Sequence, residues 1–230
     1  MFSLLDLIFP KFCIGCNKFS TYLCENCKKN IIYMDYDKCI VCGKENQEGL
    51  THKECLSKTN IDGNFSIFRH NNIIRKIMKN IKYKLATDML STLFSLIQKD
   101  DLKRQENLIN SFHIKNEEIF LQPVPLHQNR FNSRGFNQSL IFAEFFSKTF
   151  SIPIIQSINR VLDTKQQAKM KNRKEREENI KNAFVLLEKP KKNIIIIDDV
   201  LTTGETVSEI ARLLKNNGCE NVFVFTMAHG

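Results

Sequence analysis

Two aspartates stand side by side at the end of an apolar run near the C-terminus. In "NIIIIDDVLTTGET" (residues 193–206), four isoleucines lead into Asp198 and Asp199, and two threonines and a glycine follow. A buried strand that ends in carboxylates presents them at the edge of a sheet, and the next turn offers N–H groups, hydroxyls and a helix dipole to an anion. Adjacent carboxylates can accept hydrogen bonds from two vicinal ribose hydroxyls. The pattern therefore indicates a site for a ribose 5-phosphate that carries a second phosphorylated arm.

The residues assigned to this site are the two aspartates at the carboxyl edge of the predicted strand and members of the turn from Leu201 to Thr206 that follows: Asp198, Asp199, Leu201, Thr202, Thr203, Gly204, Glu205 and Thr206. Gly204 would let the backbone approach a ligand closely. The chain has neither G-x-x-x-x-G-K-[ST] nor G-x-G-x-x-G, so no motif supports an NTPase or a dinucleotide-binding protein. The structural alternative is a strand that ends in solvated acids, followed by a threonine N-cap.

Seven of the eight cysteines lie between residues 13 and 55, and the eighth is Cys219. Three C-x₂-C pairs and the segment "HKEC" supply eight ligands with one spacing: Cys13, Cys16, Cys24, Cys27, Cys39, Cys42, His52 and Cys55. Four sulfur or nitrogen donors suit a tetrahedral, structural zinc ion, so two Zn²⁺ ions are predicted. Sequential pairing is the simplest arrangement, interleaved pairing is the alternative, and His52 is the least certain ligand.

The elements that must position these residues follow from the apolar periodicity. Strands are predicted at "FSIFRH", "IFLQPVPL", "IPIIQS", "NIIIID" and "VFVFTM". Helices are predicted at 72–97, as one long helix or as two with a break near Thr87, at 137–150 and after Gly204. Residues 99–117 and 127–136 are interpreted as connections. Alternating strands and helices predict an α/β fold with a parallel sheet and its site at the carboxyl ends of the strands. We expect a zinc-ribbon module at 1–60 and the α/β domain at 61–230.

The composition is that of a globular protein with anionic partners. Hydrophobic residues make up 42% of the 230 positions, and 34 Lys and Arg against 25 Asp and Glu give a formal net charge of +9. The apolar N-terminus lacks the features of a signal peptide, and no run has the length of a membrane span. We therefore expect a cytoplasmic protein with reduced cysteines.

The motifs together resemble those of a known family. "IIIIDDVLTTGET" looks like the phosphoribosyl pyrophosphate (PRPP) motif of type I phosphoribosyltransferases. The whole chain is similar to the ComF family (ComFC-like proteins), which is linked to natural competence for DNA uptake. The resemblance rests on "LLDLIFPKFCIGC", the cysteine pairs, "KYK" at 82–84, "PVPL" and "RGFNQS" between 123 and 139, and the run from Gln166 to "NIKNAF".

This resemblance implies a type I phosphoribosyltransferase-like parallel sheet flanked by helices, with a small N-terminal double zinc-ribbon module. It implies that Asp198 and Asp199 bind the ribose of PRPP, that the threonine turn binds the 5-phosphate, and that Arg134 and Gly135 belong to the pyrophosphate loop. Arg130 would be a second cation nearby. It also implies Mg²⁺ bound together with PRPP, since magnesium takes phosphate oxygens and waters. No residue is identified as catalytic.

Three functions remain open. The first is a PRPP-binding ComF-type protein that handles incoming single-stranded DNA during transformation, with other competence proteins as further partners. The second is an active phosphoribosyltransferase of nucleobase or nucleotide metabolism, and the third is a structural zinc-ribbon protein with a relict site. The basic segment "KMKNRKER" (169–176) suits a phosphate backbone, a mobile loop over PRPP or a solvated helix face. Neither the acceptor nor the oligomeric state follows from the sequence.

Overall fold

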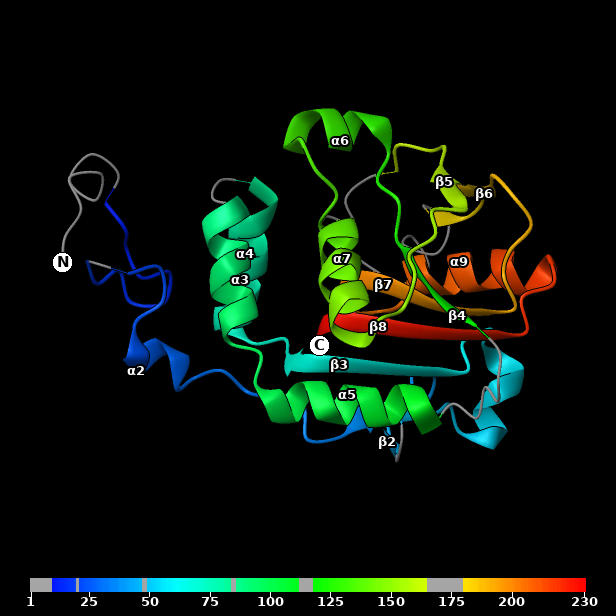
Figure 1. Cartoon of the computed structure of the whole chain (residues 1–230), viewed down its shortest axis with the longest axis horizontal. Helices are drawn as coiled ribbons and strands as arrows, with labels where there is room; N and C mark the ends of the chain where they lie inside the picture. Colours follow the sequence, from blue (N-terminus) through cyan, green and yellow to red (C-terminus); the bar gives the residue numbers. More distant parts are fainter. Residues whose placement is uncertain (1–9, 20, 47–48, 84–85, 112–117, 165–179) are drawn as a thin grey trace.

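Four parallel strands form the central sheet of the protein (Figure 1). The computed structural model describes residues 10–19, 21–46, 49–83, 86–111, 118–164 and 180–230. The strands are β3 (Gly63–Arg69), β4 (Ile119–Pro123), β7 (Asn193–Leu201) and β8 (Asn221–His229), in the order β3-β8-β7-β4. All three pairings are parallel, so the carboxyl ends of the strands lie at one edge. The predicted α/β fold is confirmed.

Strand β7 has a neighbour on each side, which explains its sequence. Its four isoleucines, residues 194–197, are fully buried, as expected for a strand covered on both faces. Its pairing with β8 extends two residues past the aspartates, to Val200 and Leu201. The turn into the next helix therefore starts one residue later than predicted, because Leu201 still belongs to the strand and buries its side chain.

Helices cover both faces of the sheet. One face packs against α3 (Asn72–Tyr83), α4 (Ala86–Ser95), α5 (Lys99–Ser111) and α7 (Gln138–Phe150), through a core that includes Ile77, Leu93, Leu108, Phe142 and Phe146. The other face packs against α9 (Glu205–Asn216) and the antiparallel pair β5 (Ile158–Arg160) and β6 (Phe184–Leu186). The helical region after residue 72 thus forms two helices, in agreement with a break near Thr87. Among the described residues, no helix has the length and hydrophobicity needed to cross a bilayer.

Two predicted connections are helical in the structure. Residues 99–111 form α5, because Gln105 and Leu108, three residues apart, bury one side of an otherwise polar helix. Residues 128–134 form the short helix α6 (Gln128–Arg134), which ends where Gly135 takes a left-handed conformation. The strand predicted at "IPIIQS" is reduced to an isolated parallel bridge between Ile154 and Leu121, and regular pairing begins only at β5.

The first ribbon, with α2 (Glu25–Lys28), packs against helix α3. A Cβ on Gly15 would lie 2.4 Å from the sulfur of Cys27 and 3.0 Å from the Cδ1 atom of Ile73 in α3. Only glycine therefore fits between the ribbon and the helix. Lys76 of α3 also donates a hydrogen bond from Nζ to the carbonyl of Gly15 at 3.3 Å.

The second ribbon, with β1 (Asp37–Lys38), β2 (Glu45–Asn46) and the 3₁₀ helix η2 (Lys53–Lys58), is attached to the edge strand β3. Asp37 is 1% exposed, and its carboxylate accepts a hydrogen bond from the N–H of Ser66 at 3.2 Å and one from Arg104 of α5. Buried charges need such partners, so the ion pair fixes the ribbon to α5 and the hydrogen bond from Ser66 fixes it to β3.

Candidate functional site

Asp198 and Asp199 lie at the carboxyl edge of the sheet, near the end of β7. Oδ1 of Asp198 accepts hydrogen bonds from the hydroxyl of Ser139 at 3.0 Å and from the N–H of Asp199 at 2.9 Å. Oδ1 of Asp199 accepts from the N–H of Val200 at 2.9 Å. These contacts use only Oδ1 of each carboxylate.

The sequence predicts no role for Lys82, which is only part of the "KYK" segment. In the structure its Nζ forms an ion pair with Oδ2 of Asp199. Burial alone would lower the pKa of Lys82, but the negative charges of Asp199 and Asp198 outweigh it and raise that pKa. Burial, followed by the charge of Asp199, raises the pKa of Asp198 to about 7. The pair of carboxylates therefore carries a charge that changes close to neutral pH.

The turn after β7 leads directly into the N-terminus of α9. Thr202 and Thr203 are exposed, Gly204 takes a left-handed conformation with φ +78°, and α9 begins at Glu205. Free N–H groups and the helix dipole meet at such a start, and both favour a phosphate. Glu205 is 5% exposed and its carboxylate oxygens have no hydrogen-bond partner in the described part of the chain. Its side chain is therefore directed into the protein, and Glu205 and Thr206 offer a ligand the backbone of the first helical turn.

Arg134 and Gly135 close the short helix α6, which follows strand β4. Nη1 of Arg134 donates a hydrogen bond to Oε1 of Gln138 at 3.2 Å, in the first turn of α7. The same turn holds Ser139, the partner of Asp198. The positive charge of Arg134 acts to lower the pKa of Lys82, which pairs with Asp199. Arg134 and Gly135 therefore lie near the two aspartates.

Arg160 is, with Lys82, a residue that sequence reasoning missed. It is 7% exposed, its guanidinium lies over the ring of Phe184 at 5.4 Å, and it donates to the hydroxyl of Thr164. Burial and the nearby charges of Arg130 and Arg134 lower its pKa to about 10, against the opposing effect of Asp198. The only signal in the sequence was one arginine within "IPIIQSINRV", a stretch otherwise without charge. Arg130, Arg134 and Asp198 thus all lie within electrostatic reach of Arg160.

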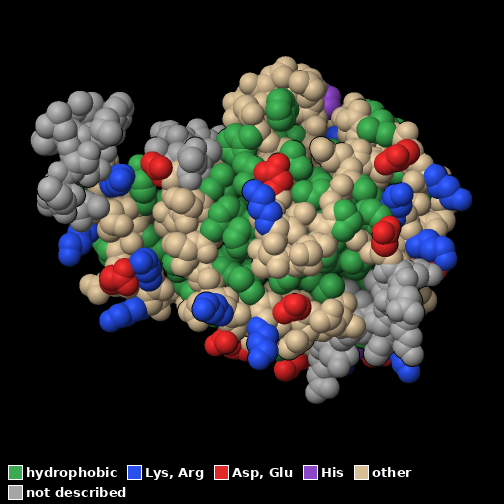
Figure 2. Space-filling view, in the orientation of Figure 1, with side chains coloured by type: hydrophobic (Ala, Val, Ile, Leu, Met, Phe, Trp, Pro, Cys, Tyr) green, Lys and Arg blue, Asp and Glu red, His purple; other side chains and the backbone are tan. Residues whose placement is uncertain are grey.

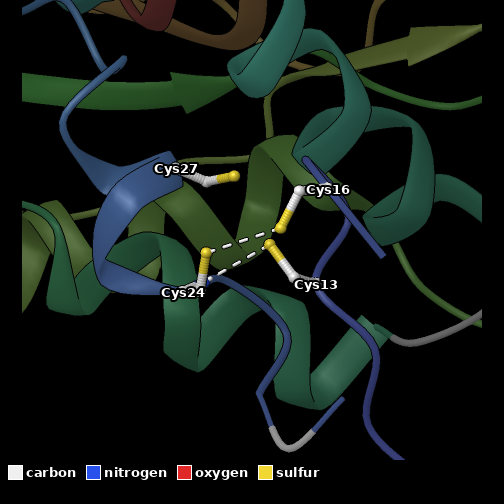
Figure 3. Close-up of side chains that lie close together, drawn as sticks. All are labelled: Cys13, Cys16, Cys24 and Cys27. Atoms are coloured by element: carbon white, nitrogen blue, oxygen red, sulfur yellow. Dashed lines mark hydrogen bonds between the residues drawn. The ribbon is translucent and has the colours of Figure 1, made fainter. Parts of the chain in front are cut away.

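The first set of cysteines converges on one point (Figure 3). The ligand atoms of Cys13, Cys16, Cys24 and Cys27 all lie within 4.8 Å of one another. Burial would raise the pKa of Cys13, but hydrogen bonds from the N–H groups of Cys24, Cys16 and Gly15 lower it to about 6. The lowered pKa favours the thiolate, which is the form that binds zinc. Four sulfurs this close together also suit a tetrahedral zinc ion, with Zn–S distances of about 2.3 Å.

The second set also consists of ligands that are consecutive in the sequence, so both sets follow the sequential pairing. The ligand atoms of Cys39, Cys42, His52 and Cys55 lie within 4.8 Å of one another, and Nδ1 of His52 is 3.3 Å from the sulfur of Cys42. Nδ1 is therefore the atom that His52 would offer to a metal. Each set supplies four protein ligands and so leaves no open coordination position, which is typical of structural zinc sites.

The surface drawn in Figure 2 carries lysine and arginine side chains interspersed with acidic ones. The excess of positive charge is therefore not concentrated on this face. The basic segment at 169–176 and the apolar residues 1–9 lie outside the described residues.

Comparisons with known proteins agree with both halves of this arrangement. Residues 4–56 match the model of the double zinc ribbon domain, and residues 137–229 match that of the phosphoribosyl transferase domain. The chain is 30% identical to competence protein F of Haemophilus influenzae over 217 residues, which covers 90% of each chain. It is 24% identical to competence protein ComFC of Bacillus subtilis, over 89% of this chain and 83% of that protein. It is also 40% identical to the DNA utilization protein YhgH of Escherichia coli over 106 residues, 45% of this chain and 46% of that protein.

The first of these relatives covers 90% of the chain, and the two domain models include the cysteine pairs (4–56) and the aspartate turn (137–229). The predicted resemblance is confirmed, and so is the combination of a zinc ribbon with a phosphoribosyltransferase fold. The chain belongs to the ComF family of competence protein F.

Proposed function

We propose that this protein binds PRPP as its magnesium complex and takes part, in the cytoplasm, in the handling of incoming single-stranded DNA during natural transformation. One observation carries the first half of the proposal. Two adjacent carboxylates at the end of β7 stand beside a threonine-glycine turn that opens a helix, and Lys82, Arg134 and Arg160 surround them. A sugar with a phosphate at one end and a diphosphate at the other matches this distribution of acceptors and cations.

In this proposal each part of the site has one role. Asp198 and Asp199 accept hydrogen bonds from the ribose hydroxyls, and the backbone from Thr202 to Thr206 binds the 5-phosphate. Arg134 and Arg160 bind the diphosphate, with Gly135 allowing the backbone to approach. Magnesium, when bound, would neutralise diphosphate charge, and the carboxylate oxygens of Asp198 and Asp199 are ligands of the kind it prefers. Residues 1–60 would form the zinc-ribbon module and 61–230 the phosphoribosyltransferase-like domain.

The DNA half of the proposal rests on the relatives and on charge. Their names concern competence and DNA utilization, and this chain has a formal net charge of +9. Binding of a fluorescent single strand should weaken steeply as salt rises, because phosphate contacts release counterions. Repeating the titration with PRPP and magnesium tests whether the two ligands are coupled, and other competence proteins are the partners to add next.

Calorimetry of PRPP with Mg²⁺ tests the site directly. The zinc-loaded wild type should bind, and an Asp198→Asn, Asp199→Asn double variant with the same circular dichroism and zinc content should not. A wild type that is folded and silent would overturn the PRPP proposal. A double variant that binds PRPP as well as the wild type would show that the two aspartates do not contribute to the PRPP site.

An active phosphoribosyltransferase of nucleobase or nucleotide metabolism is the second candidate, and the family match over residues 137–229 favours it. Release of pyrophosphate from PRPP that depends on one nucleobase would support turnover. Absence of release with every common base would leave binding as the function.

A further inference from the structure

One knuckle of the second zinc site touches the phosphate turn. Ile40 lies between the ligands Cys39 and Cys42, and a Cβ on Gly204 would lie 3.3 Å from its Cδ1 atom and 3.6 Å from its Cγ1 atom. Ile40 also packs against the core cluster that contains Leu201, the last residue of β7. A side chain at position 204 would therefore press against Ile40, which would have to give way by a few tenths of an ångström.

The knuckle is held firmly at its other end. Asp37, two residues before Cys39, is anchored to Ser66 and Arg104 in the body of the protein. Within the knuckle, the N–H of Cys39 donates to the carbonyl of Lys44 at 2.9 Å, and the N–H of Gly43 donates to that of Cys39 at 2.9 Å. These hydrogen bonds therefore hold the backbone of the knuckle, and with it Ile40, beside Gly204.

The turn lies between two fixed points: the carbonyl of Leu201 accepts a hydrogen bond from the N–H of Gly230 at 2.9 Å, and the carbonyl of Gly204 accepts one from the N–H of Ser208 at 2.8 Å. Gly204 has the conformational freedom of glycine, and Thr202 and Thr203 are exposed. We propose that Ile40 is a positioning residue that holds this turn in the shape that accepts a phosphate. The second zinc site, by fixing the knuckle, then sets the affinity for the ligand. This inference rests on the proposed function for its ligand, but the support of the turn by Ile40 is independent of it.

The direction of the effect follows from a simple equilibrium. If the turn adopts the binding shape for only a fraction of the time, the apparent dissociation constant rises by the inverse of that fraction. Loss of the Ile40 side chain that reduces this fraction to about one tenth weakens binding about tenfold. Ribose 5-phosphate and PRPP should weaken by the same factor, because both place a phosphate in this turn.

The test compares Ile40→Ala with Val41→Ala, a matched truncation at the next position of the same knuckle. Zinc content, the affinities for Mg²⁺-PRPP and ribose 5-phosphate, and hydrogen exchange of the amides at 202–206 are measured for each. Ile40→Ala should retain the wild-type zinc content, weaken both ligands about tenfold and speed exchange in the turn. Val41→Ala should match the wild type, and Ile40→Val, which removes one methyl group, should lie between.

The readouts separate the two proposals. A wild type that binds neither ligand overturns the proposed function, and faster exchange at 202–206 in Ile40→Ala still supports the positioning role. Unchanged exchange and unchanged affinity in a zinc-loaded Ile40→Ala protein overturn the inference. If Ile40→Ala loses zinc or does not fold, the same comparison is made with Ile40→Val. A wild-type exchange pattern at 202–206 in Ile40→Val then overturns the inference.

Discussion

The ammonium group of Lys82, in the last turn of α3, forms an ion pair with Oδ2 of Asp199 at the end of β7. This contact joins residues 117 positions apart in the sequence and occupies one carboxylate oxygen of the candidate site. A ribose hydroxyl that binds Asp199 must share or displace the lysine. Lys82 would then be available to the diphosphate, since an ammonium group can serve either anion.

The first prediction concerns Lys82→Gln. PRPP should lose about tenfold more affinity than ribose 5-phosphate, because only PRPP carries the diphosphate that gains a charge-assisted bond from the lysine. Calorimetry with both ligands measures the ratio. Lys79→Gln, an exposed lysine on the same helix, is the matched control and should leave both affinities unchanged. Equal losses for the two ligands would place Lys82 at the sugar and not at the diphosphate.

The second prediction is a pH dependence set by Asp198. Its folded-state pKa of about 7 lies above its ordinary value of 3.8, so the folded protein holds an extra proton between these values and the contribution of Asp198 to stability falls as pH rises. Ligand affinity should change with pH in the opposite direction, because the ionised carboxylate of Asp198 is the better acceptor of hydrogen bonds from hydroxyls. Affinity for ribose 5-phosphate should rise from pH 6 to pH 8.

The control for this experiment is Asp198→Asn, which retains shape but cannot ionise. The phosphate of the ligand has a pKa of its own near 6, and its contribution remains in the variant. The difference between the two pH profiles therefore isolates Asp198. Parallel profiles would mean that another group is responsible.

The sequence was sufficient for the strand, the aspartates and the cysteine pairs, because each has a local pattern. The buried centre of the sheet reads as "IIII", and ligands of one zinc knuckle are three positions apart. Helix α5 was missed because its buried side consists of so few residues, among them Gln105, which is polar. Lys82 and Arg160 reach the site only through the packing of α3 and β5, which no local pattern encodes.

The third prediction concerns the first zinc set. Cys24→Ser should lower the zinc content by about one equivalent, because three donors remain where four are needed, and it should lower the melting temperature, since this ribbon packs on α3. Cys219→Ser replaces a buried cysteine outside both sets and should keep both zinc ions. A metal assay with a thermal melt measures both effects. Full zinc content in Cys24→Ser would contradict the ligand assignment.

The last prediction concerns the buried pair of Asp37 and Arg104. Burial raises the pKa of Asp37 to about 6, even though the charge of Arg104 acts in the opposite direction. Arg104→Ala removes that charge and leaves a buried carboxylate without its cation, at a cost of about 3 kcal/mol in the free energy of unfolding. Lys103→Ala, an exposed neighbour on α5, should cost little.

The pH dependence of that cost identifies its cause. The pKa of Asp37 in the folded state is above its ordinary value of 3.8, so its contribution to stability falls as pH rises through about 6. Without Arg104 this pKa rises further, and the fall continues to higher pH. Urea unfolding should therefore find a larger difference between Arg104→Ala and wild type at pH 8 than at pH 5. A difference that is the same at both would mean that Arg104 stabilises through packing of its side chain and not through its charge.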